Sequence, residues 1–168
     1  MATEVKNLKE LIAPAAFAEC EVWVSKYPAE RKRSALMGCL AVAQRENGGW
    51  LTTELMDAVA DYLEVPHIAA YEVASFYSMY KLKPIGKHLV DVCTNISCML
   101  NGSEELMSHI KNKYGIGHGE TTADGRLTVR SVECLGACVG APMCQVDSRD
   151  YHEHLTPEKL DALIAGLE

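Results

Sequence analysis

The 168-residue sequence lacks both glycine-rich motifs that commonly hold nucleotide phosphates, Gly-x-Gly-x-x-Gly and Gly-x4-Gly-Lys-[Ser/Thr]. The glycines Gly115, Gly117 and Gly119 follow an expected helix rather than opening one, so we interpret them as part of a loop. We therefore expect no nucleotide site within this chain.

The sequence also lacks an apolar run long enough to cross a membrane. Its longest uninterrupted apolar stretch, Ala35 to Ala43 counting Gly38, has about half of the residues that a membrane-spanning helix needs. With 48% hydrophobic residues the chain can bury one good core or two small ones, and its formal net charge of −7 disfavours nucleic acid as a partner. These features are typical of an acidic soluble protein that reaches a membrane only through its partners.

Two further absences bear on the seven cysteines. The N-terminal residues contain acids and no apolar core of the secretory type, so we expect a reducing cytoplasmic setting, where cysteines are more often ligands or buried thiols than disulfides. An odd number of cysteines also disfavours a purely structural set of disulfides. No two cysteines have the Cys-x2-Cys spacing, which disfavours a thioredoxin-type dithiol.

Four of the cysteines form two close pairs, Cys93-x4-Cys98 and, thirty-six positions later, Cys134-x3-Cys138. Each pair lies in a glycine-bearing turn after a strand-like apolar run. A [2Fe–2S] cluster needs four thiolates, two on each iron, and two short loops side by side could supply them. The spacing of the second pair alone fits structural zinc about as well, so a zinc-binding module stays an alternative.

The remaining cysteines fit buried positions better than ligand positions. Cys39 lies on the apolar stripe of an expected helix and Cys20 is similar, so we interpret both as small buried hydrophobes. Cys144 lies six residues beyond Cys138, but within an expected strand, where the sheet core is its more natural place. His152 and His154 form a His-x-His pattern in a polar turn, where solvated histidines are commoner than a metal site.

The character of the chain changes near Lys83-Pro84-Ile85-Gly86, and we expect a domain boundary there. Residues 1–84 have helical periodicity and predict a bundle of four helices, at 15–26, 29–46, 52/53–63 and 66–79. Thr52 or Thr53 would cap the third helix, and Pro66 would occupy the first turn of the fourth.

Aromatic side chains gather at the end of the fourth expected helix. Phe76, Tyr77 and Tyr80 have helical spacing, which favours packing in the core. The alternative is an anchor on a partner protein, because aromatics near an exposed helix end serve interfaces well.

Residues 85–168 instead show strands alternating with helices. We expect strands at 87–92, 127–132 and 143–146, a helix at 102–114 capped by Asn101 with Glu104, and a last helix starting at Thr156-Pro157. If the first two strands are neighbours, both cysteine loops leave one edge of the sheet and the four sulfurs come together. Gly136 and Gly140 would allow a tight turn whose backbone N–H groups point at the thiolates.

Several strings carry a resemblance to a known family. They are Val92-Cys93-Thr94-Asn95-Ile96-Ser97-Cys98-Met99-Leu100-Asn101-Gly102, Thr121-Thr122-Ala123-Asp124-Gly125, Val132-Glu133-Cys134-Leu135-Gly136-Ala137-Cys138-Val139-Gly140-Ala141-Pro142, Gln44-Arg45-Glu46-Asn47-Gly48-Gly49-Trp50-Leu51 and Val73-Ala74-Ser75-Phe76-Tyr77-Ser78-Met79-Tyr80. From about residue 15 to its last residue, the chain resembles the small iron–sulfur subunit of respiratory complex I, which is the E subunit of bacterial NADH-quinone oxidoreductase.

This resemblance implies an α/β (α+β) protein with an N-terminal four-helix bundle at 1–84 and a thioredoxin-like [2Fe–2S] ferredoxin domain at 85–168. It implies that one [2Fe–2S] cluster is bound, with Cys93, Cys98, Cys134 and Cys138 as its metal ligands. The chain would be an electron-transfer subunit of NADH:quinone oxidoreductase, with no catalytic residue and no complete activity of its own.

The same resemblance implies a flavin- and NADH-binding subunit as partner, whose FMN exchanges one electron with the cluster. FMN and NAD would come only through that subunit. Since NADH delivers two electrons and iron–sulfur centres carry one, a flavin must divide the pair. Other peripheral-arm subunits, on the cytoplasmic side of the bacterial inner membrane, would complete the assembly. The equivalent subunit of an NAD-linked hydrogenase or formate dehydrogenase has the same plan and stays an alternative.

Overall fold

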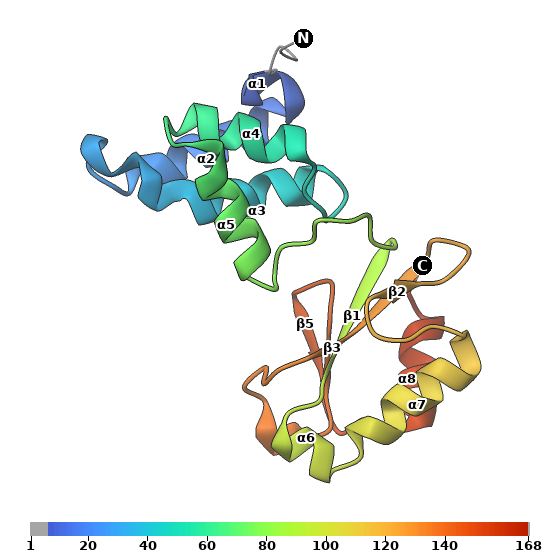
Figure 1. The fold of residues 1–168 in the computed structure, drawn as a ribbon. Helices are drawn as coiled ribbons and strands as arrows, with labels where there is room; N and C mark the ends of the chain where they lie inside the picture. The colour runs from blue at the N-terminus through green and yellow to red at the C-terminus, as the bar shows by residue number, and fades with distance from the viewer. Residues whose placement is uncertain (1–6, 168) are drawn as a thin grey trace. The chain divides into compact units, whose positions relative to one another are not determined.

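The computed structural model describes residues 7–167, and the chain divides into two compact units, Met1–Pro84 and Ile85–Glu168 (Figure 1). We call the first the helical unit and the second the α/β unit. Each has its own hydrophobic core. No helix among the described residues is long and apolar enough to span a bilayer.

The helical unit contains α1 (Leu8–Leu11), α2 (Pro14–Ser25), the 3-10 segment η1 (Ala29–Ala35), α3 (Leu36–Glu46), α4 (Thr53–Tyr62) and α5 (His67–Phe76). Helix α4 begins where the sequence predicts, because the Thr52 hydroxyl accepts a hydrogen bond from the Leu55 N–H at 3.1 Å. Helices α2 and α3 pack closely at Gly38, where the Trp23 ring occupies the space that a side chain would need.

The helical unit departs from the predicted four helices in several places. Helix α1 is not predicted by the sequence pattern. The segment predicted as one helix at 29–46 is η1 followed by α3, with Arg31 in a non-helical conformation. Pro66 is the N-cap of α5 rather than part of its first turn, and α5 ends at Phe76, before the predicted end.

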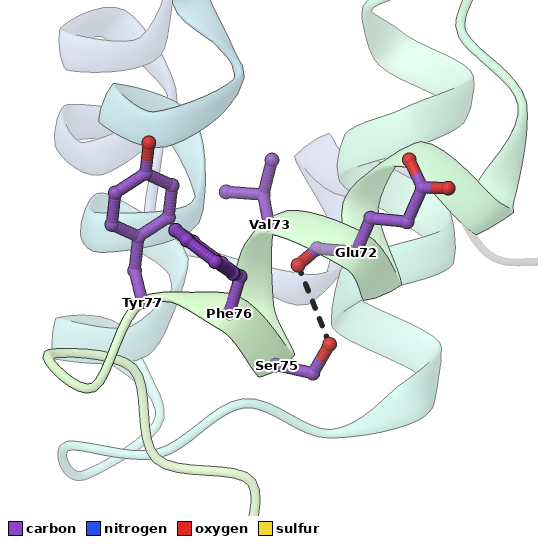
Figure 2. A pocket seen from close by; sticks show the side chains of 5 residues that line it. All are labelled: Glu72, Val73, Ser75, Phe76 and Tyr77. Atoms are coloured by element: carbon purple, nitrogen blue, oxygen red, sulfur yellow. Dashed lines mark hydrogen bonds between the residues drawn. The ribbon is translucent and has the colours of Figure 1, made fainter.

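The three aromatic residues at the end of α5 have different environments. Tyr80 is buried and its hydroxyl donates to the Met37 carbonyl at 2.8 Å, as core packing predicts. Phe76 is 79% exposed and packs edge-on against Tyr77, with 5.0 Å between ring centroids. Both rings line an open pocket of about 570 Å³ together with Glu72, Val73 and Ser75 (Figure 2).

The α/β unit contains β1 (His88–Cys93), α6 (Ile96–Leu100), α7 (Ser103–Tyr114), β2 (Glu120–Thr121), β3 (Leu127–Val132), the 3-10 turn η2 (Cys138–Gly140), β4 (Cys144–Val146), β5 (Asp150–His152) and α8 (Pro157–Ala165). The sheet order is β2-β3-β1-β4-β5. Strands β1 and β3 are parallel, and the other neighbouring pairs are antiparallel. Helices α7 and α8 pack against one face of the sheet, where Ile110 and Leu160 meet Val90 and Val129 in the core (Figure 1).

The predicted cap of α7 is wrong. Asn101 ends the preceding short helix α6, and its side-chain amide donates back to the Ser97 carbonyl at 2.7 Å. The N-cap of α7 is Gly102, with φ 101° and no side-chain cap bond. A left-handed conformation favours glycine, so Gly102 makes the sharp turn between α6 and α7. By contrast, the Thr156 hydroxyl caps α8 as predicted, by accepting from the Lys159 N–H.

Asp161 on α8 connects to α7 and should make stability depend on pH. It lies within hydrogen-bond distance of Lys113, His109 and Tyr114, at 2.7, 2.9 and 2.8 Å. These bonds, that of Lys113 foremost, hold the pKa of Asp161 well below its usual range. A carboxyl with a depressed folded-state pKa stabilises the fold above its unfolded pKa of about 4, and this stabilisation is lost as pH falls through the folded pKa.

We therefore expect Asp161→Asn to lower the melting temperature at pH 7, and the gap from the wild-type chain to narrow as pH falls below about 4. Thermal unfolding of both chains over a pH series measures this gap. A gap that stays constant from pH 7 to pH 3 would contradict the assignment.

Candidate metal centre

Both cysteine loops leave the same edge of the sheet. Strands β1 and β3 are parallel neighbours, and Cys93 at the end of β1 lies opposite Val132 at the end of β3. Cys134 follows β3 after one further residue. The carboxyl ends of parallel neighbours lie side by side. The two strands are neighbours, which is the condition under which the sequence analysis expects the four sulfurs to come together. Ligands of α/β proteins commonly bind at this edge.

The first cysteine pair is buried. Cys93 is 3% exposed, and its N–H donates to the Met143 carbonyl at 3.1 Å. Cys98 lies in α6 and is 2% exposed. Helix α6 forms directly after the strand because the Asn95 side-chain oxygen accepts from the Ile96 N–H at 2.9 Å. One turn of helix thus turns the chain so that Cys98 packs with Cys93 and Met143.

The second cysteine pair is exposed. The sulfurs of Cys134 and Cys138 lie 3.9 Å apart. Gly136 between them has φ +84°, and its N–H donates to the Cys134 sulfur at 3.4 Å. The tight turn predicted for Gly136 is therefore present. Glycine is required at position 140 for a different reason: the Glu153 side chain occupies the space that a Cβ at this position would need.

The two pairs adjoin one another. Leu135 and Ala137 of the second loop pack against the buried cluster of Cys93, Cys98 and Met143. Burial and a hydrogen bond with Cys93 raise the pKa of the Cys98 thiol to about 11, and the charge of the nearby Cys138 acts in the same direction. Metal ligation replaces the thiol proton, so a bound metal would offset the unfavourable free energy of forming a buried thiolate at Cys98.

The donor set consists of four thiolates in two pairs, the number that a [2Fe–2S] cluster takes. Within residues 7–167, no three His, Cys, Asp or Glu side chains are grouped as they would be around one metal ion. The cysteines form two pairs, and a [2Fe–2S] cluster would take two thiolates on each of its two irons.

Hydrogen bonds between the two loops were missed by the sequence reasoning. The Thr94 N–H donates to the Val132 carbonyl at 3.0 Å, and the Thr94 and Ser131 hydroxyls lie 2.7 Å apart. The Asn95 side-chain amide donates to Glu133 at 2.6 Å. Thr94 directly follows Cys93 and Glu133 directly precedes Cys134, so polar residues next to the cysteines were the available signal. Their pairing depends on the β1–β3 register, which the sequence pattern does not specify.

The other cysteines lie outside this site. Cys144 is fully buried in the core of the sheet, and Cys20 and Cys39 are fully buried in the helical unit. His152 lies in β5, and His154 follows it with its backbone N–H on the Gly140 carbonyl. Burial of the three cysteines fits their structural interpretation. His152 differs from the expected solvated turn, because it lies in a strand and is half-buried, whereas His154 is exposed. No cysteine lines the pocket of Figure 2. The candidate site is therefore the edge of the sheet with Cys93, Cys98, Cys134 and Cys138, which we call the cysteine edge.

Comparison with known proteins identifies the family. Residues 20–168 match the family described as thioredoxin-like [2Fe–2S] ferredoxin, and the chain belongs to this family. Its fold is accordingly thioredoxin-like with mixed α and β content, and its cofactor is a [2Fe–2S] cluster.

Within the family, the chain is similar to a respiratory subunit. It is 50% identical over 144 residues to the E subunit of NADH-quinone oxidoreductase from Rickettsia bellii (strain RML369-C), covering 86% of each chain. It is 47% identical over 133 residues to mitochondrial NADH dehydrogenase [ubiquinone] flavoprotein 2 of Dictyostelium discoideum, covering 79% of this chain and 53% of that protein. Chains of this kind are subunits of multi-subunit oxidoreductases.

A solved structure shares the fold. An NAD+-reducing [NiFe]-hydrogenase in the air-oxidized state superimposes with a TM-score of 0.66 and 23% identity, over 76% of this chain. The match spans only 22% of the hydrogenase chain. At this identity the likeness concerns the fold alone.

Proposed function

We propose that this chain is the electron-transfer subunit of an NADH:quinone oxidoreductase of the complex I type. Its [2Fe–2S] cluster exchanges one electron at a time with the FMN of a partner subunit. The observation that carries this proposal is the 50% identity to the Rickettsia bellii E subunit over 86% of both chains. The identity to the mitochondrial relative, at 47%, supports the same reaction class.

The proposed ligands are Cys93 and Cys98 for one iron and Cys134 and Cys138 for the other, because each pair lies together in the fold. When bound, the cluster supplies a one-electron carrier. Because Cys93 and Cys98 are buried, water would be excluded from their side of the cluster. The Gly136 N–H, which donates to the Cys134 sulfur, stabilises negative charge there and favours the reduced state.

The proposed electron donor is a flavin- and NADH-binding subunit. Hydride transfer delivers two electrons, so a flavin must divide them before an iron–sulfur centre can accept one. The sequence has neither of the glycine-rich nucleotide motifs, which supports placing both nucleotides on a partner. The assembly would lie on the cytoplasmic side of the bacterial inner membrane. Cell fractionation tests this location: the chain should be recovered in the membrane fraction only when the other subunits are present.

An apolar surface beside the exposed cysteines supports this docking. Within the described part of the α/β unit, the exposed large hydrophobic residues all lie on α6, η2 or β5. Leu100 is 77% exposed and Val139 is 98% exposed, on the two loops that carry the cysteines. Exposed apolar groups concentrated at one edge are typical of a protein interface. A partner seated there would bring its flavin close to the cluster.

We expect Leu100→Glu and Val139→Glu each to weaken binding to the flavin subunit about tenfold or more, because each buries a charge in an apolar contact. The visible spectrum should not change. Ser108→Glu, which adds the same charge on an exposed position of α7, is the control. Isothermal titration with the isolated flavin subunit measures the affinities. Equal affinities for all of these chains would place the interface elsewhere.

Anaerobic purification followed by visible and low-temperature EPR spectroscopy tests the function. Iron and sulfide should each be present at two per chain, and reduction should give a one-electron EPR signal. Addition of NADH should reduce the cluster only when the flavin subunit is present. A colourless chain containing zinc would overturn the proposal and restore the zinc-module alternative. Co-purification with a nickel or molybdenum catalytic subunit would favour the hydrogenase or formate dehydrogenase alternative.

A further inference from the structure

One side-chain hydrogen bond joins the two cysteine loops directly. The Asn95 amide nitrogen donates to a Glu133 carboxylate oxygen at 2.6 Å. Asn95 lies two residues after Cys93, and Glu133 immediately precedes Cys134. A bond from an amide to a carboxylate is charge-assisted and stronger than a neutral one.

Asn95 uses both ends of its amide group. Its oxygen accepts from the Ile96 N–H at 2.9 Å and so caps α6, the helix that carries Cys98. Its nitrogen holds Glu133. One half-buried side chain therefore orients the buried cysteine pair and connects it to the loop of the exposed pair.

We propose that Asn95 and Glu133 are a positioning pair that holds the exposed Cys134/Cys138 loop against the buried Cys93/Cys98 loop in the geometry that a [2Fe–2S] cluster requires. This inference rests on the proposed ligand set. Exposed loops that contribute half of a ligand set need such support, because surrounding hydrogen bonds orient metal ligands. The Glu133 carboxylate also places a negative charge one residue from a ligand, which disfavours reduction of the cluster.

Substitutions at these two positions can separate the effect of the hydrogen bond from the effect of the Glu133 charge. In Glu133→Gln the side-chain oxygen still accepts from Asn95, and only the charge is lost. In Asn95→Asp the cap of α6 is kept, since Asp caps helices as well as Asn does, but two carboxylates now face each other. In the double variant the introduced amide at position 133 can donate to the introduced carboxylate at position 95, so the bond returns with reversed direction.

Release of iron to a chelator from the full-length, cluster-loaded chain measures the hydrogen bond. We expect Asn95→Asp to lose iron about tenfold faster than wild type, the scale of one charge-assisted hydrogen bond, and Glu133→Gln and the double variant to stay within about threefold of wild type. Redox titration followed by EPR measures the charge. Glu133→Gln should shift the midpoint to more positive potential, Asn95→Asp to more negative potential, and the double variant should return towards wild type.

Wild-type rates in Asn95→Asp, or a double variant as fast as Asn95→Asp, would overturn the proposal. Hydrogen exchange of the Thr94 amide, which donates to the Val132 carbonyl between the two cysteine segments, provides a readout that needs no cluster. It should be faster in Asn95→Asp and restored in the double variant, and unchanged exchange would also overturn the proposal. A wild-type chain without a [2Fe–2S] spectrum would instead refute the proposed function, so the two failures are distinguishable.

Discussion

In a Cys134→Ala or Cys138→Ala chain, we expect iron and sulfide to fall close to zero and the visible [2Fe–2S] bands to disappear. Each change leaves three thiolates for a cluster that needs four. The loss falls in the exposed pair, where water would reach a cluster that lacks one thiolate. Iron and sulfide analysis of anaerobically purified chains measures the effect.

Cys144→Ala and Cys39→Ala are the matched controls for this experiment. Cys144 lies only six residues beyond Cys138, but it is fully buried in the sheet core, and Cys39 is fully buried in the helical unit. Both variants lose a small buried group, which lowers stability modestly. Their spectra should equal that of the wild-type chain. A colourless Cys144→Ala chain, or a coloured Cys134→Ala chain, would overturn the ligand assignment.

The cysteine edge was predictable because its signals are local. The runs before Cys93 and Cys134 have strand character, and the strand predicted at 127–132 is β3 at the same bounds. Strand β1 differs from its prediction by one residue at each end. The assumption that these two strands are neighbours was needed to bring the cysteines together, and the sheet order meets it.

Short elements were beyond the reach of periodicity. Helix α6 has five residues and β2 has two, which is too few for a repeating apolar pattern to be recognised. Helix α6 depends instead on its Asn95 cap and on packing around Cys98. The error at Asn101 has the same origin: without α6, Asn101 resembles the cap of a helix, whereas it ends one.

Helical periodicity also did not predict which aromatic side chains are exposed to solvent. Phe76 and Tyr80 have the same residue character and helical spacing, yet Phe76 is 79% exposed and Tyr80 is 5% exposed. Helix α5 ends at Phe76, so helical periodicity no longer determines which residues beyond it face the core. Tyr80 is buried by the turn that follows, where its hydroxyl reaches the Met37 carbonyl.

A buried ion pair joins β1 and β3 close to both cysteine loops. Asp91 and Arg130 are directly opposite each other in the sheet, with Arg130 Nε and Nη2 at 2.7 and 2.6 Å from the two carboxylate oxygens. The Asp91 side chain is 6% exposed and that of Arg130 is 16% exposed. Asp91 lies two residues before Cys93 and Arg130 four residues before Cys134. The pair thus connects the strands from which both loops depart.

Removing one partner of this pair should destabilise the fold strongly. Arg130→Met leaves the Asp91 carboxylate buried without its main counter-charge, which costs about 3–5 kcal/mol in comparable sites. For a unit of this size that corresponds to a fall in melting temperature of more than about 10 °C. Thermal unfolding of the full chain, followed by circular dichroism, measures it.

The double variant Asp91→Leu/Arg130→Met distinguishes a lost ion pair from lost packing. A buried ion pair is often no more stabilising than apolar residues of similar volume, so the double variant should recover most of the stability that Arg130→Met loses. If the double variant unfolds at the temperature of Arg130→Met, the loss lies in the packing of the long Arg130 side chain and not in an unpaired charge. Recovery would instead show that the inner strands tolerate neutral packing at this position, and that strand pairing itself keeps the two loops adjacent.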